Sequence, residues 1–184
     1  MNGSGLDLPL LLIFLVAPLG AFDVIYFHVL KFRLAQRPAS WAETQTHVVR
    51  SFLLGAVVLL LALAEPRGLW FWVVAGLFGL DFVNSVLDAL TEDASRAELG
   101  GLPRGEYVIH IIGSTAMGAI AVAFLHGGFH LSELDTALVA RPTPLSGLMA
   151  ANAMAVAIGS LVLGGYEAVT MMLSKRRQVA VRRA

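Results

Sequence analysis

Five long apolar stretches constrain the fold of this 184-residue chain more than any other feature. A membrane-spanning helix needs about 20 mostly apolar residues. The sequence supplies such stretches at about 7–33, 40–64, 68–91, 103–126 and 145–173. The composition, 57% hydrophobic and only 14% charged, is also unlike that of a soluble domain. We therefore predict an all-α integral membrane protein with five transmembrane helices in a single transmembrane domain, residues 1–174.

The remaining composition excludes several classes of protein. Lys and Arg together number 13, as do Asp and Glu, so no excess of positive charge indicates a nucleic-acid partner. The absence of cysteine excludes disulfides, thiolate metal sites, thiolate-held iron–sulfur clusters and cysteine nucleophiles. Residues 1–20 lack the basic segment of a signal peptide, and their apolar run continues beyond any cleavage point. We therefore interpret them as part of a first membrane helix.

Basic residues are distributed unevenly among the connections, and this predicts the orientation. The first and third connections and the tail, residues 175–184, are basic, whereas the second and fourth connections carry one arginine each, Arg67 and Arg141. The basic residues on the first side are Lys31, Arg33, Arg37, Arg96, Arg104, Lys175, Arg176, Arg177, Arg182 and Arg183. We expect the N-terminus outside and a cytoplasmic C-terminal tail, in a membrane such as the bacterial inner membrane.

Two sequence patterns each occur twice, in the same order. The skeleton E-x3-H-x3-S-x3-G appears at 43–55 and at 106–118, and VAPLGAFD at 16–23 resembles VAGLFGLD at 74–81. Such self-similarity predicts an internal repeat. Helices one and two, about 7–64, would then be duplicated as helices three and four, about 68–126, around a pseudo-two-fold axis along the membrane normal. We predict a four-helix bundle, with the fifth helix packed against it.

Ionisable side chains at membrane depth are costly and usually mark function. Six of them obey the repeat: Asp23, Glu43 and His47 in the first copy, and Asp81, Glu106 and His110 in the second. Residues four apart share one face of a helix, so each Glu-His pair points one way. At about 1.5 Å per residue, all six lie in the cytoplasmic half of the bundle. This pattern predicts one polar site that opens toward the cytoplasm.

Four carboxylates and two histidines on four helices are also the ligand inventory of ferritin-like di-iron and di-manganese bundles. Carboxylates cancel the charge of two hard cations, and one imidazole for each metal leaves a position open. The similarity covers ligand number and symmetry only, because those bundles use Glu-x-x-His. The spacing of four found here is instead that of H-E-x-x-H zinc helices. We predict two divalent metal ions, with iron favoured over manganese or zinc.

Further polar residues at this depth break the repeat. They are His28, Asn84, Asp88 and Arg50, interpreted as extra or supporting groups around the metals or as interfacial residues, and Tyr26, a candidate redox or hydrogen-bonding residue. Arg50 is the only basic residue expected near the acids. For Glu43 a purely structural role is open, because Ser40 and Glu43 have the spacing of a helix capping box.

Two other polar segments are given no part in the site. The charged stretch at 91–98 has no apolar face, and we interpret it as a solvated connection. The HGGFH segment at 126–130 contains two glycines, so we expect an outer loop there, and the role of His126 and His130 stays open.

Several functions are compatible with these residues. The favoured one is a di-iron oxidoreductase or oxygenase that acts on a lipid-soluble, lipid-like or quinone-like molecule within the membrane. The alternatives are a zinc-dependent membrane hydrolase, a divalent metal transporter or carrier, a bis-histidine haem protein, and a structural subunit of a larger complex or homodimer. The outer half offers no acidic path for a transported ion, and two haem ligands would not explain four carboxylates.

Overall fold

The computed structural model describes residues 5–141 and 145–183, and it is 86% helical. Five helical segments are long and apolar enough to cross a membrane, as predicted from the sequence. They are Asp7–Lys31, Pro38–Leu63, Leu69–Leu99, Arg104–Glu133 and Gly147–Ala180. This architecture is that of an integral membrane protein. Residues 142–144, which belong to the fourth predicted connection, lie outside the described residues.

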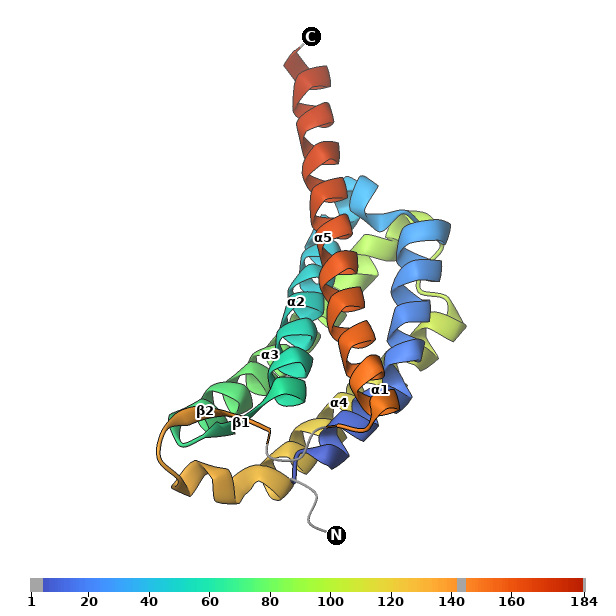
Figure 1. Cartoon of the computed structure of the whole chain (residues 1–184). Coiled ribbons are helices and arrows are strands. Elements are labelled where there is room, and N and C mark those ends of the chain that lie inside the picture. The colour runs from blue at the N-terminus through green and yellow to red at the C-terminus, as the bar shows by residue number, and fades with distance from the viewer. Residues whose placement is uncertain (1–4, 142–144, 184) are drawn as a thin grey trace.

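The spans run alternately up and down, so that short connections join neighbouring ends (Figure 1). The main elements are α1 (Asp7–Phe22), η1 (Asp23–Lys31), α2 (Trp41–Leu63), β1 (Ala64–Arg67), α3 (Leu69–Arg96), α4 (Arg104–Gly128), β2 (Ala137–Ala140) and α5 (Gly147–Arg183). Short 3-10 turns, η2 (Leu34–Gln36), η3 (Pro38–Ser40), η4 (Ala97–Leu99) and η5 (Phe129–Glu133), complete the connections. We call the end with residues 32–40 and 97–103 the polar end, and the end with β1 and β2 the strand end.

The buried face of α3 shows how the sequence divides the bundle into two layers. Its buried residues recur every three or four positions, which is the period of one helix face. They are Phe71, Val74 and Phe78 toward the strand end, followed by Asp81, Asn84 and Asp88 toward the polar end. Large apolar side chains such as Phe82 and Leu90 point outward instead. The helix therefore turns aliphatic groups to the lipid and its polar stripe to the interior.

An aromatic and aliphatic core closes the strand end. Phe71 and Phe124 stack with ring centroids 4.9 Å apart, and Leu6, Leu10 and Val58 are buried around them. In a bilayer this packing is stabilised by van der Waals contacts rather than by the removal of apolar surface from water, because lipid is itself apolar. The grouped histidines and carboxylates lie in the other half of the bundle, whereas the buried Glu65 and Arg141 belong to the connections at the strand end.

The second half of the first span is a π-helix, η1, which follows α1 without a break. Its backbone hydrogen bonds join residues five apart, and π-helical segments are often found at functional sites. Asp23 and His28 are five apart, and both are buried in the bundle. In a regular α-helix two such residues would lie on different faces. The wider turn thus brings both side chains to the interior.

The two outer connections form a short antiparallel ribbon that the sequence reasoning did not anticipate. β1 pairs with β2, with Ala64 opposite Ala140 and Arg67 opposite Ala137. Next to it, Arg141 donates to the Leu61 carbonyl oxygen at 2.9 Å and forms an ion pair with Asp7. The ribbon satisfies backbone groups of the connections where the helices end, and Arg141 ties α1 to α2.

Three expectations about element boundaries were wrong. The stretch 91–98 is not a solvated connection, because α3 continues through Arg96 and buries it. The segment 126–128 is not a loop, because α4 continues to Gly128. The fifth helix does not end near 173, since α5 continues to Arg183 through the basic segment. In each case the local composition resembles a loop, but helical hydrogen bonds and packing determine the structure.

Gly127 shows why the glycine pair does not interrupt α4. A Cβ at Gly127 would lie 2.3 Å from the Gly5 carbonyl oxygen, so the glycine permits the backbones to approach closely. We expect Gly127→Ala to lower the free energy of unfolding by roughly 1–3 kcal/mol, the usual cost of overpacking. The measurement is thermal or denaturant unfolding in detergent. Gly118→Ala is the control on the same helix, because a Cβ there meets nothing within 4 Å. Equal stability of the two variants would contradict this packing.

Candidate metal centre

Five of the six predicted metal ligands converge at the polar end. Asp23 comes from η1, Glu43 and His47 from α2, and Glu106 and His110 from α4. His28, predicted only as an extra residue, lies among them. His110 is partly exposed and the others are buried. The amphipathic faces of three segments therefore place their polar groups in one interior volume.

The first group of donors consists of Asp23, His28, Glu106 and His110. One ligand atom from each lies within 4.8 Å of the others. His110 Nε2 is 3.1 Å from Asp23 Oδ2, and His28 Nε2 is 3.2 Å from Glu106 Oε1. Ligand atoms bound at about 2.0–2.2 Å around one ion are separated by comparable distances. The group therefore has the composition and the spacing of a site for one divalent cation.

The second group consists of His28, Glu43 and His47, so His28 belongs to both groups. His28 Nε2 is 4.0 Å from Glu43 Oε1, and the His28 and His47 rings are 4.1 Å apart between centroids. Three donors leave room for other ligands. His28, which has no counterpart in the second copy of the sequence repeat, is thus the residue that the two donor groups share.

Arg96 lies between the two glutamates, and the sequence reasoning missed it. Its side chain is 0% exposed, with Nη2 2.8 Å from Glu43 Oε1 and 3.5 Å from His28 Nε2. The same nitrogen contacts Glu106 Oε1. Arg50 is therefore not the only basic residue near the acids. The guanidinium lies between two of the carboxylates that the sequence predicts as metal ligands.

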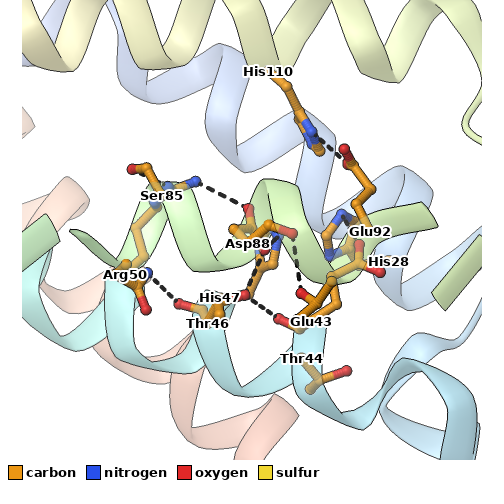
Figure 2. Close-up of polar contacts among 12 residues, drawn as sticks. His28, Glu43, Thr44, Thr46, His47, Arg50, Ser85, Asp88, Glu92 and His110 are labelled. Carbon is orange, nitrogen blue, oxygen red and sulfur yellow. Dashed lines mark hydrogen bonds and ion pairs between the residues drawn. The ribbon is translucent and has the colours of Figure 1, made fainter. Parts of the chain in front are cut away.

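Glu92 was also missed, although it holds His110 from the opposite side. Its Oε1 is 2.8 Å from His110 Nδ1 (Figure 2). The other ring nitrogen, His110 Nε2, faces Asp23. A carboxylate on one ring nitrogen commonly fixes the orientation of a metal-binding imidazole. The sequence did contain a signal, because Asp88, Glu92 and Arg96 follow one another at intervals of four and share one face of α3.

The acidic stripe of α3 lies beside the donor groups. Asp88 Oδ1 is 3.3 Å from His47 Nε2, and Asp88 also accepts a hydrogen bond from Thr46 (Figure 2). Asp81 instead pairs with Arg50, with 3.4 Å between Oδ1 and Nε. Asn84 donates to the Thr46 carbonyl oxygen at 2.9 Å. Asp81 is thus not among the grouped donors, whereas Asp88 holds His47 much as Glu92 holds His110.

The structure bears on two further expectations, the capping box formed by Ser40 and Glu43 and the role of Tyr26 at the site. Ser40 makes no capping hydrogen bond to α2, and its hydroxyl donates to the Ser95 carbonyl oxygen at 3.3 Å. The capping box is therefore absent, and Glu43 faces Arg96 instead. Tyr26 is 43% exposed and stacks on Phe22, with ring centroids 5.2 Å apart. The structure thus places Tyr26 at the surface of the bundle rather than among the donors.

Negative charge exceeds positive charge in this interior. Among the described residues, seven buried or partly buried carboxylates, Asp23, Glu43, Asp81, Asp88, Glu92, Glu106 and Glu167, accompany only two arginines, Arg50 and Arg96. Buried charges require neutralisation, and buried polar atoms require partners. Several atoms of this cluster have no hydrogen-bond partner: Asp23 Oδ1, His28 Nδ1, Glu43 Oε2, Glu106 Oε2 and Glu167 Oε2. Oxygen and imidazole donors with this charge fit a divalent cation.

A cavity of about 670 Å³ adjoins the cluster. Residues of α1, α2, α4 and α5 line it, and most of its wall is aliphatic, as at Val16, Leu54 and Met117. Its polar part is formed chiefly by Asp23, His47, Arg50 and His110. This volume is within the range of small-molecule sites, which are typically apolar with a few converging polar groups. A molecule in the cavity would contact three of the candidate ligands, Asp23, His47 and His110.

Comparison of the chain with protein-family models, with curated proteins and with solved structures gives no match. The site therefore has to be interpreted from its own chemistry.

The role of Arg96 can be tested by removing its charge. Arg96→Gln leaves Glu43 and Glu106 close together without their shared cation, and loss of one partner of a buried ion pair typically costs about 3–5 kcal/mol. We expect a loss of stability of that size in protein stripped of metal, measured by denaturant unfolding in detergent. Arg104→Gln, at an exposed position near the same end, is the control and should unfold like the wild type. Identical stability of both variants would show that Arg96 does not neutralise the glutamates.

Proposed function

We propose that this chain is a membrane-embedded metalloenzyme that oxidises or oxygenates a lipid-soluble substrate at a histidine and carboxylate centre. The observation that carries this proposal is that two of the four grouped donors, Asp23 and His110, line a largely apolar cavity of about 670 Å³. A purely structural cluster of charges would not require such a cavity. An enzyme that acts on a lipid-soluble substrate requires both a group of metal ligands and a cavity for the substrate.

The donor set favours iron. Asp23, Glu106, His28 and His110 offer two carboxylates and two imidazoles, without sulfur. Two histidines and a carboxylate with open positions are the ligands of many non-haem iron oxygenases, and zinc and manganese accept the same atoms. Bound iron would supply one-electron redox chemistry at the edge of the cavity. The excess of buried carboxylates supports a cation of charge two or higher.

A second ion would use Glu43 and His47, with His28 between the two positions. Arg96 now lies between Glu43 and Glu106, so a second ion would replace the guanidinium as the group that neutralises both. We propose two divalent ions, of which the one at Asp23, His28, Glu106 and His110 has the fuller ligand set.

The residues around the donors hold the two imidazoles of His47 and His110 in position. Glu92 orients His110 and Asp88 orients His47, so each imidazole is held by a carboxylate of α3. Asp23 Oδ1 is buried without a hydrogen-bond partner, and Asp23 lines the cavity. The aliphatic wall excludes water from the reacting atoms.

The predicted duplication agrees with the helix packing. α1 packs against α4, and the corresponding helices of the second copy, α3 and α2, also pack against each other. Glu43 and Glu106, equivalent in the repeat, meet at one arginine. We propose that a duplicated two-helix hairpin forms a pseudo-two-fold bundle to which α5 was added. By the distribution of basic residues the polar end faces the cytoplasm, in a bacterial inner membrane.

Metal content provides the direct test. We expect elemental analysis of purified protein to find about two iron ions per chain, as in carboxylate-bridged bundles. His110→Ala and Asp23→Asn remove donors of the fuller position, so each should lower the iron content at least to about half. His126→Ala is the control, since His126 is an exposed histidine of the same helix at the strand end.

The outcomes distinguish the candidate functions. Zinc at the same residues would favour the hydrolase over the oxidoreductase. Wild-type protein that binds no metal, and whose stability is unchanged by His110→Ala, would contradict a metal centre of any kind.

A further inference from the structure

The cavity beside the donor groups indicates the kind of molecule that reaches them. We propose that it binds one aliphatic chain of a membrane lipid, lying along α4 and α5 with one end at Asp23 and His110. The cavity alone supports the binding of this lipid chain. Its role as substrate rests on the function proposed above.

The wall of the cavity suits a flexible hydrocarbon chain better than a ring. Among the described lining residues, Tyr166 is the only Phe, Tyr or Trp side chain. Aromatic ligands are usually held by stacking against such side chains, and here Leu, Ile, Val, Ala, Met and Gly prevail instead. An aliphatic chain needs only this apolar surface. The quinone-like ligand that the sequence left open is therefore the less favoured one.

The length of the cavity matches one lipid chain. Lining residues extend from Ile109 to Ile120 on α4 and from Asn152 to Tyr166 on α5. At about 1.5 Å per residue these segments are roughly 16 Å and 21 Å long. The hydrocarbon core of a bilayer is about 30 Å thick, so the chain of one leaflet occupies about 15 Å. A single extended chain would fill the cavity without crossing the membrane.

Three glycines open the cavity. A Cβ at Gly20, Gly113 or Gly159 would meet nothing within 4 Å, and all three line the cavity. Gly20 and Gly159 are also exposed on the surface of the bundle, on α1 and α5. Polar side chains such as Asp23, Arg50 and Ser114 also line the cavity, so water can occupy its polar part, whereas the aliphatic wall offers water no partners. Lipid is the apolar material that surrounds these helices, so a lipid chain can enter between α1 and α5.

The same glycines provide a sharp test. The double variant Gly113→Leu/Gly159→Leu places two side chains into the space where the chain would lie. Gly118→Leu is the matched control, because Gly118 lies on α4, is equally open and does not line the cavity. The probe is palmitic acid carrying a photoreactive diazirine in mid-chain, added to purified protein in detergent. A phosphatidylethanolamine with the same acyl chain forms a second arm, which distinguishes a free acid from a phospholipid.

We expect adducts on cavity residues such as Leu19, Met117 and Val156 in the wild type and in Gly118→Leu. The double variant should show at least a tenfold loss of these adducts in the arm that labels the wild type. Absence of adducts on the lining residues in both arms, or equal labelling of the double variant, would overturn the proposal.

Metal content measured on the same samples separates this inference from the proposed function. Adducts without bound metal would leave the chain site standing and would contradict the metalloenzyme. Bound metal without adducts would contradict the chain site and would leave the metal centre standing.

Discussion

The excess of buried carboxylates at the polar end is the constraint on which the rest of the structure depends. Each carboxylate removed from water must be neutralised or hydrogen-bonded, and in a bilayer no solvent is available along the helix to do this. Arg96 and Arg50 neutralise part of the charge, and three histidines lie among the acids. The proposed cation would neutralise the remaining charge and would give partners to the buried oxygens that have none.

The fold places the aromatic core and the charged cluster at opposite ends of the bundle. At the strand end Phe71, Phe78 and Phe124 pack into a core, which leaves the interior there to apolar groups. A transported cation would have to pass through this layer, so the packing favours a site that is reached from one side. At the polar end the π-helical η1 brings both Asp23 and His28 into the cluster. The candidate metal ligands are thereby confined to one half of the bundle, beside the cavity.

Much of this arrangement could be predicted from the sequence, because length and repetition are local signals. The five spans follow from apolar runs, and the repeated Glu-His spacing pointed to Glu43, His47, Glu106 and His110. Asp23 was identified from its apolar run and joins the first donor group. Asp81 was identified in the same way but pairs with Arg50, because the neighbouring Asp88 reaches His47 instead.

The rest depends on features that a helical period does not reveal. His28, predicted as an extra or supporting group, enters the centre because η1 is wound as a π-helix, since a period of 3.6 residues would turn it away from Asp23. Glu92 and Arg96 were missed because their segment has no apolar face, although their interval of four from Asp88 was visible. A charged stretch at the end of a membrane helix can thus be buried when its partners are themselves charged.

Anomalous X-ray diffraction from crystals of metal-loaded protein, recorded at the absorption edge of the bound metal, tests the central claim most directly. We expect the strongest anomalous peak among Asp23, His28, Glu106 and His110, within bonding distance of all four. Crystals with metal bound elsewhere, or with no anomalous peak and Arg96 still between the glutamates after soaking in ferrous, manganous and zinc salts, would contradict it.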